Sequence, residues 1–139
     1  MSKTWNFPAE ATQLLNDVRA KSEDVVQQSD AQTLLNEHYT TDWTHVGYQL
    51  ALVRSDVNAM GKDLCRLQAI RRVADPWQQR EIHRITPRLQ DMAAQTEASI
   101  VLLNNNQQSY WSTGLPNDMA DVYRDAVRVQ LGPASTSGS

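Results

Sequence analysis

The stretch Trp43–Leu67, WTHVGYQLALVRSDVNAMGKDLCRL, decides the fold of this 139-residue chain. Its apolar residues recur at spacings of three and four without a gap, which is the pattern of one long helix with an apolar seam. The seam consists of Trp43, Val46, Leu50, Val53, Val57, Met60, Leu64 and Leu67. We expect this helix to begin near Ala31 and to end before Asp75, because the residue that precedes a proline resists the α conformation.

The segment that follows carries a second seam of the same kind. Asp75 is suited to cap a helix that begins at Pro76, and Gln78 occupies the third position of a capping box. Pro87 interrupts the seam and predicts a kink or a fresh start capped by Thr86. The seam consists of Ile82, Ile85, Leu89, Met92, Thr96, Ser99 and Leu103.

The two seams fit one another in antiparallel register. If the chain reverses near Asp75, Leu67 faces Ile82 and Val46 faces Leu103, and the residue numbers of all pairs between them have the same sum. Each apolar side chain then meets an apolar or small partner. The sequence therefore predicts a long antiparallel helical hairpin.

Two shorter helices flank this hairpin. The first follows Asn6 and is interrupted at 27–30, and the last begins near Pro116 and stops at Gly132. We expect an all-α, up-down four-helix bundle over residues 1–132, with residues 133–139 as a flexible tail. The short helices pack at the open end of the hairpin, and its turn end projects as a two-helix arm.

Composition sets broad limits on function. The chain is 40% hydrophobic and 21% charged, with a net charge of −3, which argues against bulk nucleic-acid binding. Its longest apolar stretch, 100–103, is too short to span a bilayer, and both a cytoplasmic protein and an exported one whose signal has been removed fit the sequence. The single cysteine, Cys65, excludes an internal disulfide, and its mid-helix position predicts a buried structural thiol.

Charge is divided unevenly along the chain. Residues 62–91 hold seven basic and four acidic side chains, whereas the remainder holds six basic and twelve acidic ones. Trp77 lies beside the hairpin turn and is either a protein-contact anchor or a cover over Val73. We interpret the chain as a non-enzymatic interaction or scaffold module that presents a basic hairpin tip to a protein partner or a second copy. The expected partner-binding residues are Arg71, Arg72, Trp77, Arg80 and Arg84.

The open end of the bundle supplies an alternative, a small-molecule or metal carrier. A second stripe along the central helix places His38, His45 and Tyr48 against the first helix. The Cα atoms of the two histidines would lie roughly 10.5 Å apart, too far for one metal ion, so we predict partly buried histidines and no metal or cofactor. We expect the chain's aromatic residues to gather at this end, namely Trp5, Phe7, Trp43, Tyr48, Tyr110 and Trp111. No nucleophile–base arrangement or phosphate-binding glycine loop is present, so no catalytic residue is predicted.

Overall fold

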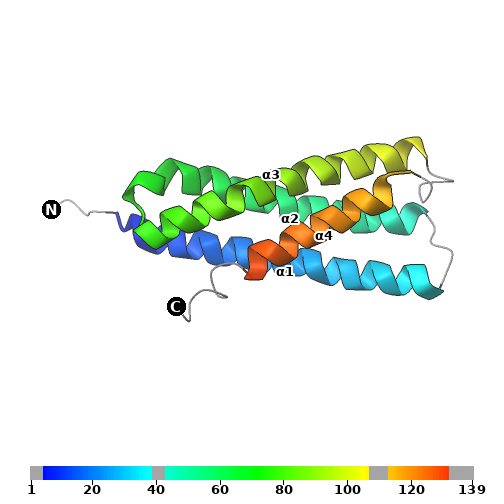
Figure 1. The fold of residues 1–139 in the computed structure, drawn as a ribbon, viewed down its shortest axis with the longest axis horizontal. Helices are drawn as coiled ribbons and strands as arrows, with labels where there is room; N and C mark the ends of the chain where they lie inside the picture. Colours follow the sequence, from blue (N-terminus) through cyan, green and yellow to red (C-terminus); the bar gives the residue numbers. More distant parts are fainter. Residues whose placement is uncertain (1–4, 39–42, 107–112, 132–139) are drawn as a thin grey trace.

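The computed structural model describes residues 5–38, 43–106 and 113–131, without the side chains of 29–38, Trp43 and Leu131. Over these residues the chain forms α1 (Phe7–His38), α2 (Trp43–Ile70), a short 3-10 turn η1 (Arg71–Val73), α3 (Pro76–Asn105) and α4 (Leu115–Leu131). Each helix runs antiparallel to the one before it (Figure 1). The predicted all-α, up-down bundle is confirmed.

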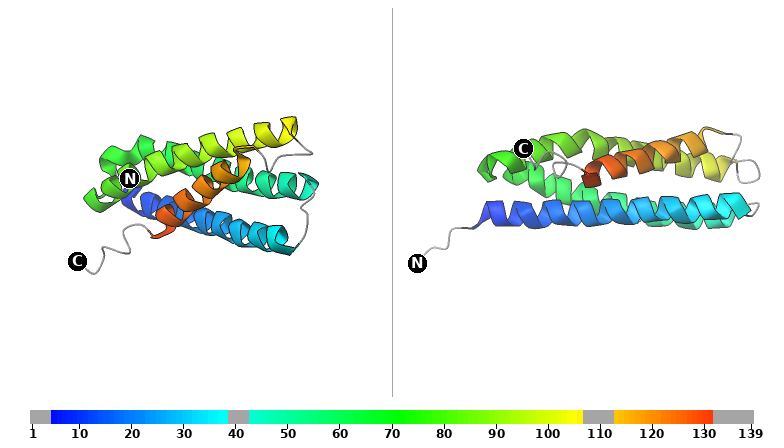
Figure 2. Two further views of the ribbon diagram at one scale, coloured as in Figure 1. Left: turned by 45° about the vertical axis from the view of Figure 1, so that its right-hand side comes forward. Right: turned by 60° about the horizontal axis from the view of Figure 1, so that its bottom comes forward.

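The helices are arranged as a square in which neighbours in sequence are neighbours in space. α1 packs against α2 and α4, and α3 packs against the same two helices (Figure 2). We call the end where η1 joins α2 to α3 the tip, and the opposite end, where α2 and α4 begin, the open end. The first turn of α1 also lies at the tip (Figure 1).

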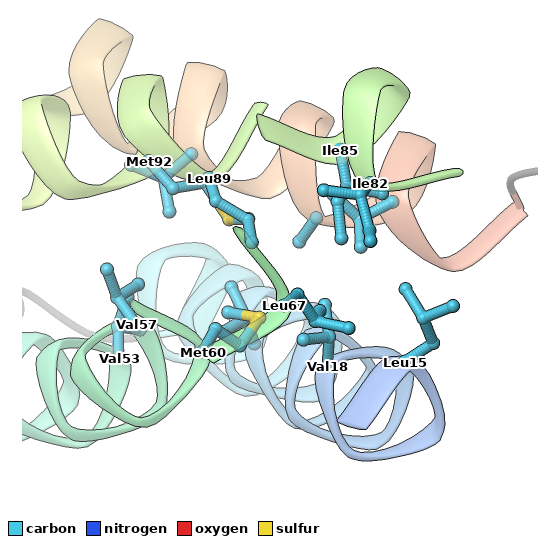
Figure 3. Packing of buried hydrophobic residues seen from close by; sticks show 14 of the residues in the cluster. Leu15, Val18, Val53, Val57, Met60, Leu67, Ile82, Ile85, Leu89 and Met92 are labelled. Atoms are coloured by element: carbon cyan, nitrogen blue, oxygen red, sulfur yellow. The ribbon is translucent and has the colours of Figure 1, made fainter. Parts of the chain in front are cut away.

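The seams of α2 and α3 form the centre of the bundle (Figure 3). All of their described side chains are buried except that of Leu64, which is partly buried. The predicted antiparallel register holds, since a Cβ built on Gly47 would lie 3.5 Å from Leu103 Cδ2 and the side chains of Arg54 and Glu97 pair at 2.8 Å. Each of the larger apolar side chains contributes roughly 1.5–3 kcal/mol by its burial, so this seam is a major source of the stability of the fold.

The start of α3 agrees with the sequence prediction, whereas the course of the helix at Pro87 does not. Asp75, the N-cap residue, and Gln78, the third residue of the helix that begins at Pro76, form the capping box. The fresh start predicted at Pro87 is wrong, because α3 continues through this residue as one helix. Pro87 lies on the exposed face of α3, where a backbone carbonyl that loses its partner can bind water.

The predicted boundary between the first two helices is also wrong. α1 is continuous through 27–30 and has 32 residues, so it is longer than α2 rather than a short flanking helix. The interrupting residues are Gln, Gln, Ser and Asp, which each reduce helix stability by only a few tenths of a kcal/mol when packing favours the helix. The chain therefore reverses after His38 and not at Ser29.

The longer α1 changes what lies at the tip. Contacts along its length, such as Ser22 Oγ donating to Met60 Sδ at 3.2 Å, place α1 beside the whole of α2. α4 ends beside Arg84, whose guanidinium donates to the carbonyl oxygens of Arg128 and Val129 at 2.8 and 3.1 Å. The predicted two-helix arm is thus wrong: the tip is a three-helix structure of α1, α2 and α3.

Gln78 joins the helices that meet at the tip. Its side chain is only 1% exposed, and its Oε1 accepts a hydrogen bond from the backbone N–H of Asp75 at 2.9 Å. Its Nε2 donates to the Pro8 carbonyl oxygen at 2.8 Å and to Thr12 Oγ1 at 2.9 Å. α1 and α3 are diagonal neighbours elsewhere in the bundle, and this amide connects them where α4 has ended.

We predict that Gln78→Met lowers the free energy of unfolding by about 1–3 kcal/mol, because it leaves buried polar groups without partners while keeping side-chain size. Urea unfolding followed by circular dichroism measures the change. Gln90→Met, at an exposed position of the same helix, is the matched control and should change stability by less than about 0.5 kcal/mol. Equal effects of the two substitutions would contradict the role given to the Gln78 amide.

Candidate functional site

The tip exposes large apolar side chains together with arginines. Trp5 is 63% exposed, Val73 51% and Trp77 45%, so Trp77 does not cover Val73. Arg71, Arg72 and Arg80 are exposed beside them. We define the basic tip as the side chains of Arg71, Arg72, Val73, Trp77 and Arg80.

Five of the chain's ten arginines form ion pairs in the described part of the chain, and the arginines of the basic tip, like Arg19 and Arg128, are not among them. In the part of the chain that the structure describes, none of the three forms an ion pair with a carboxylate. Five other arginines do, and they are Arg54, Arg66, Arg84, Arg88 and Arg124. The cations of the basic tip are therefore available to a ligand without breaking an internal pair.

Arg84, predicted to bind a partner, is engaged within the fold instead. Its guanidinium pairs with the buried carboxylate of Glu81 and holds the last turn of α4, as described above. A cation at a helix C-terminus stabilises the helix by meeting its free carbonyl groups. We therefore leave Arg84 out of the basic tip.

The N-terminal aromatic residues lie at the tip and not at the open end, because α1 extends the full length of the bundle. Trp5 Nε1 donates to Glu10 Oε1 at 2.8 Å, and the same carboxylate accepts from Arg66 Nε at 2.6 Å and Nη2 at 2.9 Å. The Arg66 guanidinium also lies 6.0 Å from the centre of the Phe7 ring. The hydrogen bonds from Arg66 and Trp5 lower the pKa of Glu10. These contacts fix the start of α1 on α2.

A hollow of about 560 Å³ lies beside the basic tip, between η1 and the first turns of α3. It is open to solvent and is lined by Arg71, Pro76, Gln79, Arg80 and His83. His83 is exposed. None of the lining side chains is acidic, so the hollow has a positive character.

Two of the three residues proposed for a carrier site, His45 and Tyr48, have described side chains. His45 is exposed and Tyr48 is 65% exposed, so the prediction that both pack against the first helix is wrong. The reason is the register, since α1 and α2 reverse after His38, whose side chain lies outside the described part. Trp43, Tyr110 and Trp111 likewise have no described side chains.

A second hollow, of about 650 Å³, lies between α2 and α3 toward the open end. Its lining includes Gly47, Ala51, Ser55 and Ile100, but neither His45 nor Tyr48. Among the described residues, no group of three or more His, Cys, Asp or Glu side chains could hold a metal ion. This hollow thus lacks the residues that the carrier hypothesis needs.

Cys65 is exposed, and the prediction of a buried thiol is wrong. It lies one position beyond Leu64, which itself is only partly buried, and so turns to the outer face of α2. Its surroundings supply no evidence of a reactive thiol.

Facing carboxyl groups across α1 and α2 are a feature that the sequence did not reveal. Burial, followed by the effect of the neighbouring Asp17 carboxyl, raises the pKa of Asp63 to about 7, against the opposing effect of Lys21. Burial and the charge of Asp24 raise the pKa of Asp56 in the same interface, again opposed by Lys21.

A similar pair lies between α3 and α4. Asp125 is buried, and burial together with the neighbouring Asp91 carboxyl raises its pKa to about 7, although Arg88 opposes the shift from 3.5 Å. The Oδ2 atoms of Asp63 and Asp125 are buried without a hydrogen-bond partner. A proton shared within each pair would satisfy these oxygens, so both pairs favour a singly protonated state. The burial of Asp63 and Asp125 could have been inferred only from their neighbours in the sequence, since each directly precedes an apolar residue, Leu64 or Ala126.

Comparison of the chain with protein-family models, curated proteins and solved structures gives no match. In the described part of the chain, no helix combines the length and the apolar character needed to cross a membrane. The function must therefore be argued from the chain's own surfaces.

We predict that the free energy of unfolding falls as pH rises from 5 to 8, by about 1–2 kcal/mol for each aspartate pair. The folded pKa values of Asp63 and Asp125 lie near 7, above the ordinary value, so at pH 5 the folded chain holds protons that the unfolded chain has released. This stabilisation is lost as pH rises through the folded pKa. Chemical denaturation at several pH values measures it.

Asp63→Asn and Asp125→Asn should each reduce that pH dependence. Asp121→Asn, which removes a partly exposed carboxylate paired with Arg124, is the matched control and should leave it unchanged. A wild-type stability that rises steadily from pH 5 to pH 8 would contradict the shared protons.

Proposed function

We propose that this chain is a non-enzymatic interaction module that binds an acidic protein surface through the basic tip. The main support for this proposal is a group of three exposed arginines, Arg71, Arg72 and Arg80, beside the exposed Trp77. These arginines have no carboxylate partner among the described residues. Tryptophan and arginine are the side chains that most often dominate binding energy in protein interfaces.

The anchoring of the tip supports this proposal. η1 and the start of α3 are held by the capping box and by the bonds from Gln78 to α1. A surface fixed before binding loses little conformational entropy when a partner docks. The basic tip is thus suited to recognition by preformed shape and charge.

The positive charge of the basic tip favours an acidic partner. A second copy of this chain is one candidate for that partner. Residues 22–53 contain five acidic side chains and neither lysine nor arginine. The described parts of this segment belong to the end of α1 and the start of α2, which lie toward the open end, opposite the tip (Figure 1). Contacts between the tip of one molecule and the open end of another would bring opposite charges together.

A selection from a phage-displayed peptide library on immobilised protein tests the proposal. We expect enrichment of peptides that combine Asp or Glu with a large apolar residue. Their affinity should fall at least roughly tenfold for the Arg71→Glu/Arg72→Glu double variant and for Trp77→Ala, because the first introduces repulsion and the second removes the apolar anchor.

The matched control is Arg19→Glu/Lys62→Glu, which makes the same change in net charge at exposed positions away from the tip. This variant should keep the affinity of the wild type. Peptides that bind the tip variants as well as the wild type would contradict the proposal. Native mass spectrometry of the freshly purified protein tests the carrier alternative, since a stoichiometric added mass would favour a bound small molecule over an interaction module.

A further inference from the structure

The hollow beside the basic tip presents hydrogen-bond donors and positive charge from two elements. Arg71 comes from η1, whereas Arg80 and His83 lie one turn apart on α3. Both guanidinium groups are exposed, and neither pairs with a carboxylate in the described part of the chain. A ligand for this hollow must therefore supply acceptor oxygens and negative charge.

Neighbouring polar groups do not neutralise the hollow. Two acidic residues adjoin the lining in sequence: the carboxylate of Asp75 belongs to the capping box of α3, and that of Glu81 pairs with Arg84. The Gln79 side chain is fixed by a hydrogen bond from its Nε2 to the Ala74 carbonyl oxygen at 3.0 Å. Pro76 supplies an apolar wall.

The number and geometry of the donors distinguish between anions. A guanidinium group donates two parallel hydrogen bonds, and one carboxylate satisfies one such group. A phosphate monoester carries three terminal oxygens and a charge between −1.5 and −2 near neutral pH, which matches two guanidinium groups and an imidazole N–H together.

We propose that this hollow binds a phosphate monoester, carried by a phosphorylated side chain of the protein partner, between Arg71, Arg80 and His83. This inference rests on the proposed function and specifies the partner's chemistry. The hollow, of about 560 Å³ and open to solvent, has room for a phosphorylated side chain together with neighbouring atoms of the partner. Trp77 and Val73 lie beside the hollow, where they can contact residues that flank the phosphorylated one.

Titration of ¹⁵N-labelled protein followed by NMR tests the assignment. The probes are an acetylated and amidated Gly-phosphoserine-Gly peptide, the corresponding Gly-Glu-Gly peptide, and inorganic phosphate. The phosphopeptide should cause saturable shifts confined to the amides of residues 71–83, and it should bind roughly tenfold more tightly than the glutamate peptide, which engages fewer donors. It should also bind more tightly than inorganic phosphate, which lacks the peptide contacts.

Arg71→Gln and Arg80→Gln should each weaken phosphopeptide binding roughly tenfold, because each removes a charge-assisted pair of hydrogen bonds. Arg19→Gln removes the same charge from an exposed position on α1 and should leave binding unchanged. Circular dichroism confirms that each variant keeps its helical fold, which is expected because none of these side chains is buried.

Several outcomes would overturn the inference. Equal affinity for the glutamate peptide would make the hollow a general anion site, and equal affinity for inorganic phosphate would assign it to the free ion. The absence of a saturable shift within 71–83 would remove the site altogether. The proposed function is judged separately, since the selected peptides carry no phosphate and their dependence on the basic tip is measured without it.

Discussion

The buried amide of Gln78 joins the first turn of α3 to the first turns of α1, and the tip of the bundle depends on this connection. In a four-helix bundle these two helices are diagonal neighbours and are normally separated by the other pair. Here α4 ends beside Arg84, so the tip contains α1, α2 and α3 alone. The bonds of Gln78 to Pro8 and Thr12 close the space beyond the end of α4. A polar group buried in this way stabilises one specific arrangement, because any other would leave it without partners.

The position at which α4 ends also explains why some arginines form contacts within the fold and others do not. Arg84 and Arg88 face α4 and meet its carbonyl groups and Asp125, and Arg66 faces the start of α1 and meets Glu10. The arginines of the basic tip lie beyond the end of α4, on η1 and the start of α3, where they form no ion pair with a carboxylate of the described residues. Their exposure is therefore a consequence of where α4 stops. Carboxyl groups also face one another between helices, Asp63 with Asp17 and Asp125 with Asp91. The raised pKa values of Asp63 and Asp125 favour one shared proton in each pair.

The sequence was sufficient to predict the long seams and their pairing. Apolar residues at spacings of three and four, such as Val53 and Val57, are a signal that few alternative structures produce. The capping box at Asp75 and Gln78 was also predicted correctly, because it depends only on local residues. The buried contacts of Gln78 with α1 were not predicted, since they join residues far apart in the chain.

The length of α1 was harder to predict. The error in its length led to wrong predictions for the surroundings of several candidate site residues. Residues 27–30 are moderate helix formers, and only packing along α2 decides that they stay helical. Placing the reversal at Ser29 put Trp5 and Phe7 at the wrong end and paired His45 and Tyr48 with the wrong partners. Local charge indicated the position of the basic tip, and its side chains are exposed, whereas the contacts of Arg84 depend on where α4 ends. Its function as a binding surface stays a proposal.

The most direct measurement is an NMR determination of contacts from the Gln78 side-chain amide. Because its Nε2 lies within hydrogen-bond distance of Pro8 and Thr12, we predict nuclear Overhauser effects from the amide protons to both residues. Backbone chemical shifts should also be helical without a break through residues 27–30. Absence of these contacts, together with non-helical shifts at 27–30, would contradict the account, because the start of α1 would then lie away from the tip.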